Sequence, residues 1–170
     1  MTRLMTYDDA PALAELLEIN REFLAPWEPV RGEDYFTADG QRAVIHDVLE
    51  QYGRGAALPH VITGDGGEVV GRITLNGIVR GAFQSCSVGY WVAEASNGRG
   101  FASRALDEIV RIAFGELGLH RVQAETLLDN VRSQRILERN GFVRYGLAPS
   151  YLKIAGRWQD FILFQRINPD

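Results

Sequence analysis

The kind of secondary structure that the sequence favours changes abruptly at a pair of glycines in the middle of the chain. Residues 85–92, SCSVGYWV, are rich in β-branched and aromatic residues, as in a strand. From about Gly100 to Leu117 the apolar residues instead recur three and four positions apart, as on one face of a helix. The segment EASNGRG lies between them. A strand that passes into a helix through a short glycine loop indicates a fold that combines both kinds of element.

The rest of the chain also divides into helices and strands. Helices are expected at residues 8–24 and 37–52, with Thr37 as a possible N-cap, and the Pro- and Gly-containing segment 25–36 between them is expected to be a loop or broken helix. Strands are expected at 60–64, 68–78 and 85–92, the first two joined as a hairpin by the Asp-Gly turn. A strand at 120–128, a helix at 130–141 closed by Gly141, and two antiparallel strands within 142–167 complete the pattern. The prediction is one domain over residues 1–170, with a mixed, mostly antiparallel sheet flanked by helices on both faces.

Composition excludes several classes of function. A chain of 170 residues that is 46% hydrophobic can build its own core. Its net charge of -4 argues against general nucleic-acid binding, which needs a basic face. Cys86 is the single cysteine and the chain has three histidines, so we expect neither an internal disulfide nor a metal cluster. Without a leader pattern or an apolar span of membrane length, we expect an unprocessed protein of the reducing cytoplasm.

The glycine loop has the properties of an anion site. At a helix N-terminus, unpaired backbone N–H groups and the positive end of the helix dipole point toward the preceding loop. Gly98 and Gly100 would let the backbone approach an oxygen closely, and Arg99 and Ser103 could add donors. A diphosphate would suit such a loop, although neither the Walker pattern nor the dinucleotide fingerprint is present. The alternative is a plain structural turn.

The residues around this loop resemble a known family. Asn97 to Ala102, NGRGFA, is similar to the Gln/Arg-x-x-Gly-x-Gly/Ala signature of the GNAT N-acetyltransferase superfamily, except that Asn97 stands where Gln or Arg is commoner. Residues 118–146 resemble the second family motif. REFLAPWEP, together with HRVQAETLLDNVRSQRILERNGF, is similar to the branch that acetylates the N-termini of ribosomal proteins. The resemblance covers nearly the whole chain. It implies a splayed sheet and direct transfer of an acetyl group from acetyl-CoA to a primary amine, the favoured acceptor being an alanine or serine N-terminus of a ribosomal protein.

The resemblance also assigns residues to acetyl-CoA. The strand would splay from its neighbour after Val92, and the main chain of Trp91 and Val92 would pair with the pantetheine arm. Asn130 and Ser133 would face the pantetheine and its sulfur. Arg135 and Arg139 could reach the adenine or 3′-phosphate, although solvated charges explain them equally well. The diphosphate would be held by the loop and first helical turn: Asn97, Gly98, Arg99, Gly100, Phe101, Ala102 and Ser103.

The implied chemistry needs a base for the amine, a donor for the developing oxyanion and a proton for the leaving thiolate. The backbone N–H of Val92 is the expected oxyanion donor. Glu125 is the leading candidate for the base, with His120 as a rival. Many superfamily members carry a tyrosine that acts as the general acid where this chain has Leu137. The proton for the thiolate would therefore come from Ser133 or from water. Cys86, without a histidine placed beside it, is interpreted as a core residue rather than a nucleophile.

The acceptor amine is the part of the reaction that the sequence determines least. The segment 25–36 carries acidic side chains that could favour a cationic amine, namely Glu28, Glu33 and Asp34, and Glu28 could bind the substrate ammonium. The same segment carries the aromatic residues Trp27, Tyr35 and Phe36. These could contact apolar parts of the acceptor or simply pack against the protein. A small amine, an amino acid or an antibiotic is an alternative acceptor. Two other readings are a non-catalytic acyl-CoA sensor and a structural interaction module, the latter dimerising through its final strands. A homodimer is possible in any of these cases.

Overall fold

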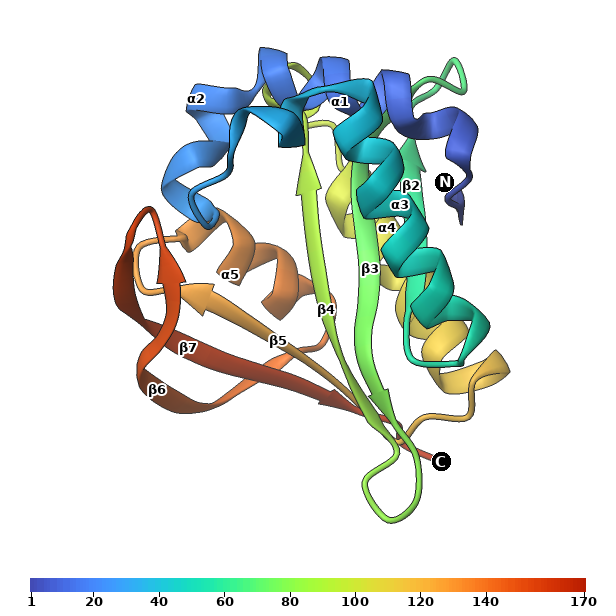
Figure 1. Ribbon diagram of the computed structural model, residues 1–170. Coiled ribbons are helices and arrows are strands. Elements are labelled where there is room, and N and C mark those ends of the chain that lie inside the picture. The colour runs from blue at the N-terminus through green and yellow to red at the C-terminus, as the bar shows by residue number, and fades with distance from the viewer.

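A seven-stranded sheet runs through the molecule between two layers of helices (Figure 1). The computed structural model describes all 170 residues. The strand order is β1-β2-β3-β4-β5-β7-β6, and every neighbouring pair is antiparallel except β4 and β5, which are parallel. The strands are β1 (Thr2–Leu4), β2 (Leu58–Thr63), β3 (Val69–Val79), β4 (Ser85–Val92), β5 (Arg121–Leu127), β6 (Val143–Ile154) and β7 (Arg157–Ile167). This is the α/β class, with the mixed, mostly antiparallel sheet expected from the sequence.

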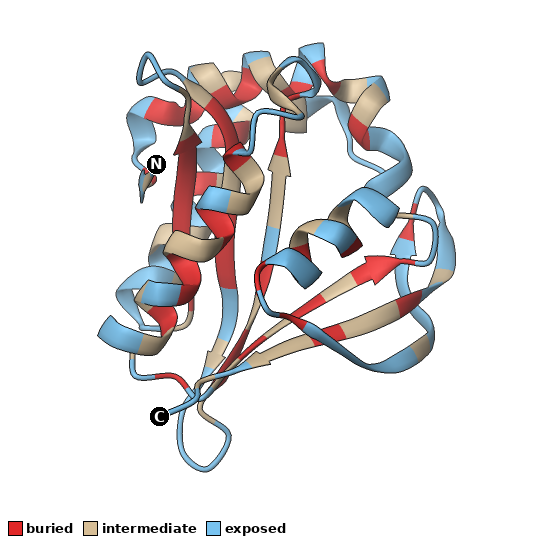
Figure 2. Ribbon diagram, turned by 180° about the vertical axis from the view of Figure 1, so that it is seen from behind, coloured by how far each residue is buried: buried red, intermediate tan, exposed pale blue.

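The helices cover both faces of the sheet. Those of the chain are α1 (Ala10–Ile19), α2 (Arg21–Leu24), α3 (Ala38–Gly53), α4 (Phe101–Arg111), which continues as a π-helical turn at Ile112–Glu116, and α5 (Val131–Arg139). Figure 1 looks onto the face covered by α1 and α3, and Figure 2 onto the face covered by α4 and α5. The largest cluster of buried apolar side chains lies under α4, and a smaller one lies under α1 and α3. We call these the α4 face and the α1 face.

The first expected helix is broken at Asn20. Its side-chain amide donates to the carbonyl of Leu16, which ends α1, and α2 begins one residue later. The Asn20 Oδ1 accepts a hydrogen bond of 2.8 Å from the backbone N–H of Glu94, in the loop that follows β4. The break therefore ties α2 to the end of β4. The second helix forms as expected, with Thr37 capping it through a hydrogen bond from the N–H of Gly40.

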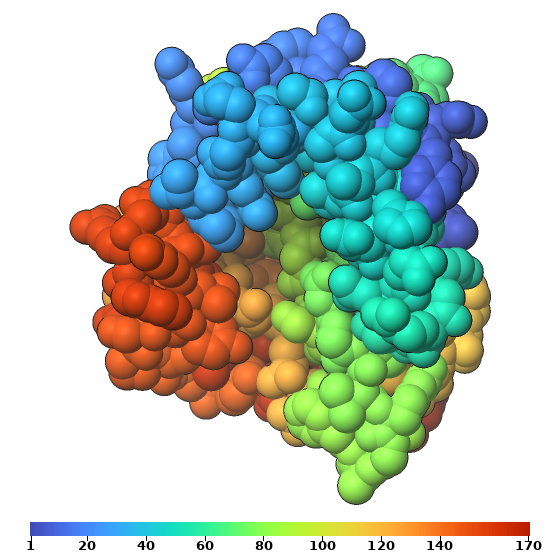
Figure 3. Space-filling view, viewed as in Figure 1, coloured from blue at the N-terminus to red at the C-terminus, as the bar shows by residue number.

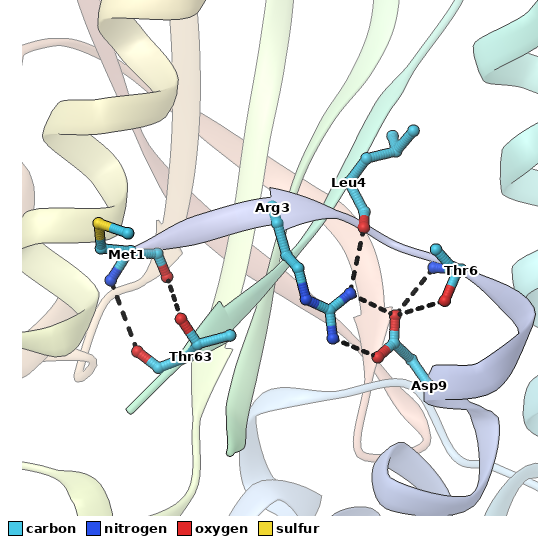
Figure 4. A network of polar contacts seen from close by, with 6 residues as sticks. All are labelled: Met1, Arg3, Leu4, Thr6, Asp9 and Thr63. Atoms are coloured by element: carbon cyan, nitrogen blue, oxygen red, sulfur yellow. Dashed lines mark hydrogen bonds and ion pairs between the residues drawn. The ribbon is translucent and has the colours of Figure 1, made fainter. Parts of the chain in front are cut away.

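A short first strand was not expected from the sequence. Residues Thr2–Leu4 pair with β2, and Figure 4 shows the polar contacts around this strand. The guanidinium of Arg3 contacts both carboxylate oxygens of Asp9 at 2.9 and 2.7 Å, and Asp9 also accepts from the N–H of Thr6. Three residues are too few for a periodic pattern, and their partner strand lies more than fifty residues away. Only the tertiary structure identifies this strand.

The sheet opens between β4 and β5. Only three residue pairs join these strands, ending at Ser87 and Gln123. We expected the opening after Val92, but it begins five residues earlier. The reason is that β4 stays paired with β3, and β5 stays paired with β7 along its whole length, so each strand follows the twist of its own antiparallel partner. Figure 1 shows β5 swinging away from the upper half of β4. The gap that results holds the candidate site.

Candidate active site

Three connected cavities run from the glycine loop to the opening in the sheet. The loop cavity, about 470 Å³, lies between the start of α4 and α5. The middle cavity, about 320 Å³, shares several lining residues with it: Val92, Asn97, Ala102, Val131, Arg132 and Ile136. The sheet cavity, about 330 Å³, lies at the gap between β4 and β5 and shares another set with the middle cavity: Leu24, Trp27, Tyr90, Trp91, Asn130 and Ser133. An elongated ligand can therefore pass from the loop to the sheet.

The loop cavity begins at two glycines in left-handed conformations. Gly98 has a φ of 77° and Gly100 a φ of 79°, and residues with a side chain rarely adopt such backbone angles. A Cβ atom at Gly98 would meet no atom within 4 Å, so the cradle is open. Gly100 is the N-cap of α4, and no side chain caps this helix. The first N–H groups of α4 are consequently left for a ligand.

The donors around the loop cavity suit an anionic, diphosphate-bearing ligand. The side-chain nitrogen of Asn97 is buried without a hydrogen-bond partner, which indicates a missing acceptor. Three arginines of α5 line the cavity and take part in none of the ion pairs of the structure: Arg132, Arg135 and Arg139. Ser103 lines it too, and its Oγ accepts from Asn140. These residues give the cavity a positive lining.

Arg99 differs from the expectation. Its guanidinium pairs with Asp65 of the β2–β3 turn at 2.7 Å and does not line the loop cavity. Phe101 and Ala102 do line the cavity. Because Arg99 extends outward from an exposed loop, an acidic residue of the neighbouring turn reaches it first. No local pattern predicts this contact, since the two residues are far apart in the chain.

Beyond the opening, β4 has a free backbone edge. Ala93 donates its N–H to the carbonyl of Val70 on β3, and bonding alternates along an antiparallel strand. Trp91 therefore also bonds toward β3, while the N–H groups of Tyr90 and Val92 point toward the gap. The expectation that the main chain of Trp91 faces the gap is wrong by one position. The side chain of Trp91 nevertheless lines the middle and sheet cavities.

Two hydroxyl groups meet where the middle and sheet cavities join. Asn130 caps α5 by accepting from the N–H of Ser133 at 3.2 Å, which fixes the first turn of this helix against β4. The Oγ of Ser133 lies 2.9 Å from the hydroxyl of Tyr90. Burial raises the pKa of Tyr90 to about 12, although its bond to Ser133 acts in the opposite direction. Both hydroxyls thus stay protonated near neutral pH.

Glu125 lies on the other side of the same gap. Its Oε2 accepts from the Oγ of Ser87 at 3.2 Å, and both side chains lie on the α1 face. Burial raises the pKa of Glu125 above its ordinary value, and the bond from Ser87 offsets part of this effect. Glu125 lines the sheet cavity. A half-buried carboxylate with a raised pKa, at a cavity, is suited to accept a proton.

The remaining candidates of the sequence analysis lie elsewhere or have other contacts. His120 is exposed directly before β5 and lines none of the three cavities. Cys86 is buried in the core, and burial raises the pKa of its thiol to about 12. Leu137 is buried as well, with 1% of its surface exposed. No group of three or more His, Cys, Asp and Glu side chains is arranged to hold a metal ion. None of the helices combines the length with the apolar character that a membrane-spanning helix requires.

The segment after α2 forms one wall of the sheet cavity. Figure 3 shows the surface hollowed between this segment, the β6–β7 hairpin and the central strands. Trp27 and Glu28 line the cavity, and burial raises the pKa of Glu28, while the charges of Arg31 and Arg72 lower it. Tyr35, instead of lining the cavity, stacks under the guanidinium of Arg31. Of this segment's aromatic residues, only Trp27 faces the opening.

Sequence reasoning missed several lining residues. Tyr90 lies in a run that predicts only a strand, although a tyrosine that turns inward on a strand usually has a partner for its hydroxyl. Arg132 carries no such signal, because a single arginine at a helix start is commonly solvated. Arg72 could be found only from strand pairing, which sets it opposite Trp91 at the cavity.

Comparison with known proteins agrees with this geometry. The family described as acetyltransferase (GNAT) domain matches residues 1–143. The chain is 34% identical, over its full length and 88% of the relative, to ribosomal protein uS5-alanine N-acetyltransferase of Escherichia coli (strain K12). It superposes on ribosomal-protein-S5-alanine acetyltransferase from Vibrio fischeri with a TM-score of 0.93 and 32% identity, covering 99% of this chain and 93% of the other. For Mycobacterium smegmatis RimJ in complex with CoA-disulfide the TM-score is 0.95, with 31% identity and 99% and 83% coverage. The chain belongs to the GNAT acetyltransferase family and is an acetyl-CoA-dependent acetyltransferase.

Proposed function

We propose that this enzyme acetylates a protein N-terminal α-amino group, as in a ribosomal protein that begins with alanine or serine, and that residues 1–170 work as one catalytic domain in the cytoplasm. The acceptor is argued from the Escherichia coli relative, whose name gives ribosomal protein uS5 and alanine, and whose likeness extends over the whole chain. The observation that carries the proposal is the continuous row of cavities, which leads from an anion cradle to a carboxylate on the other side of the sheet.

The row of cavities suggests how the residues divide the work of binding acetyl-CoA. The N–H groups at the start of α4, with Gly98, Gly100 and the unpartnered amide of Asn97, would hold the diphosphate. The free backbone edge of β4 at Tyr90 would bond the pantetheine arm as an added strand would, which leaves the N–H of Val92 for the carbonyl oxygen of the acetyl group. When acetyl-CoA is bound, it supplies the activated acetyl group at the gap between β4 and β5.

Glu125 would act on the amine. An α-amino group has a pKa of about 7.7–8.0, so near pH 7 most of the acceptor is protonated and one proton must be removed. Glu125 lies on the α1 face, where the hollow seen in Figure 3 gives access from solvent. Glu28, on the same wall, would attract the ammonium form. The N–H of Val92, directed into the gap, would stabilise negative charge on the carbonyl oxygen.

Transfer to a defined acceptor tests the proposal. We expect purified protein with acetyl-CoA to acetylate a synthetic peptide that begins with Ala or Ser, and mass spectrometry of fragments to locate the group on the α-nitrogen. A peptide with a blocked N-terminus and an internal Lys is the matched control. Acetylation of the Lys, or of spermidine and free amino acids but no peptide, would contradict the proposed acceptor.

A second experiment tests the cradle separately from the acceptor. Gly100→Glu forces a side chain into the left-handed region and adds a negative charge where a diphosphate would lie. We expect calorimetric titration to detect acetyl-CoA binding to the wild type and none to this variant. Full binding by the variant would show that the glycine loop is only a turn.

A further inference from the structure

The structure offers a proton donor for the leaving thiolate that the sequence did not suggest. Leu137, at the position where a tyrosine is common, is an apolar core residue. Ser133 alone is a poor acid, because an aliphatic hydroxyl gives up its proton far less readily than a phenol. The hydroxyl of Tyr90, however, lies 2.9 Å from the Oγ of Ser133 and reaches it from another element, β4.

We propose that Tyr90 is a catalytic residue, and that Tyr90 and Ser133 together donate the proton that the departing CoA sulfur receives. This inference rests on the proposed function, because it needs acetyl-CoA in the row of cavities. Both side chains line the middle cavity and the sheet cavity, so the pair lies where the pantetheine end and the acceptor would meet.

The placement of the two proton-transfer groups supports this role. Residues that alternate along β4 face opposite sides: Trp91 packs with the α1-face cluster and Tyr90 with the α4-face cluster. Glu125 lies on the α1 face and the Tyr90–Ser133 pair on the α4 face. The base and the acid therefore approach the gap between β4 and β5 from opposite sides. The amine can lose its proton on one side while the sulfur gains one on the other.

The acidity of the phenol suits a buried thiolate. Burial raises the pKa of Tyr90 to about 12, and burial in the same sheet raises the pKa of the Cys86 thiol to about 12 as well. Burial disfavours the charged form of a thiol as it does that of a phenol, so a thiolate expelled into this cavity is a stronger base than one in water and readily takes a proton.

The acetyl transfer forms one bond at the carbonyl carbon and breaks another. The amine nitrogen forms a bond to the carbonyl carbon and its proton passes to Glu125. The carbon–sulfur bond breaks and its electron pair stays on sulfur. Sulfur takes a proton from the Oγ of Ser133, which takes one from the hydroxyl of Tyr90. Solvent returns a proton to Tyr90 and removes one from Glu125, so the products are an amide and a thiol.

The first test compares leaving groups. We expect Tyr90→Phe to lower kcat with acetyl-CoA about 100-fold, with little change in the dissociation constant for acetyl-CoA. With para-nitrothiophenyl acetate, whose thiolate needs no proton to depart, Tyr90→Phe and the wild type should have similar rates. Tyr52→Phe, on the exposed face of α3, is the matched control and should match the wild type with both donors. An equal loss with both donors would assign Tyr90 a merely structural role.

The second test does not depend on turnover. The ultraviolet absorbance of the thiolate reports the ionisation of CoA bound to the protein. A donated hydrogen bond stabilises the thiolate, so we expect the pKa of bound CoA to rise by about one unit in Tyr90→Phe. An unchanged pKa, or wild-type kcat in Tyr90→Phe, would overturn the inference. If the wild type itself acetylates no amine, the proposed function fails instead, while the thiolate titration still reports on Tyr90.

Discussion

At the scale of single residues, the protonation of Glu125 depends on one neighbour. Ser87 donates to its Oε2 at 3.2 Å and so favours the charged form. In Ser87→Ala the carboxylate loses this bond, and its pKa should rise by about one unit, since a hydrogen bond to a charged group contributes roughly 1.5–3 kcal/mol. The acid limb of the pH profile of kcat/KM should move to higher pH. Ser85→Ala, on the same strand without a contact to Glu125, should leave the limb in place.

Glu125 also links activity to stability. Burial raises its pKa in the folded protein, so the folded state binds a proton more tightly than the unfolded state does. Its contribution to stability is present below the unfolded pKa of about 4.3 and is lost as pH rises through the folded pKa. Glu125→Gln should therefore lose most activity yet unfold at a higher temperature than the wild type at neutral pH. The difference should shrink in thermal scans toward pH 4, and a constant difference would contradict this account.

At the scale of elements, the junction between β4 and α4 depends on left-handed backbone. Gly100→Ala introduces a Cβ at a φ of 79°, which should lower the free energy of unfolding by roughly 1–2 kcal/mol. Gly115→Ala is the matched control: it lies in the π-helical turn after α4, has no positive φ, and would meet no atom within 4 Å. It should be neutral or stabilise by up to roughly 1 kcal/mol. Denaturant unfolding measures the free energy of unfolding of both variants, which should decrease in Gly100→Ala and should not decrease in Gly115→Ala.

At the scale of the whole molecule, a ligand that spans the three cavities joins the two halves of the opened sheet. Acetyl-CoA at one hundred times its dissociation constant should stabilise the fold by about 2.7 kcal/mol, which corresponds to a rise in Tm of roughly 5–10 °C. Acetyl-pantetheine lacks the diphosphate and should give a smaller shift at equal concentration. Added salt should weaken the effect of acetyl-CoA, because Arg132, Arg135 and Arg139 line the loop cavity. Equal shifts with both compounds would contradict a role for this cavity.

Features that depend on neighbours along the chain can be predicted from the amino-acid sequence alone. The alternation of helices and strands, the Thr37 cap and the glycine loop are local, because backbone conformation and helix periodicity act over a few residues. The GNAT motif is local in the same sense, and it led to the family. Contacts between distant segments, in contrast, are visible only in the folded protein: the strand β1, the break at Asn20 tied to Glu94, the ion pair of Arg99 with Asp65, the start of the opening at Ser87 and the hydroxyl pair of Tyr90 and Ser133. Such contacts depend on strand register and on the packing of elements against each other, and no local pattern encodes either.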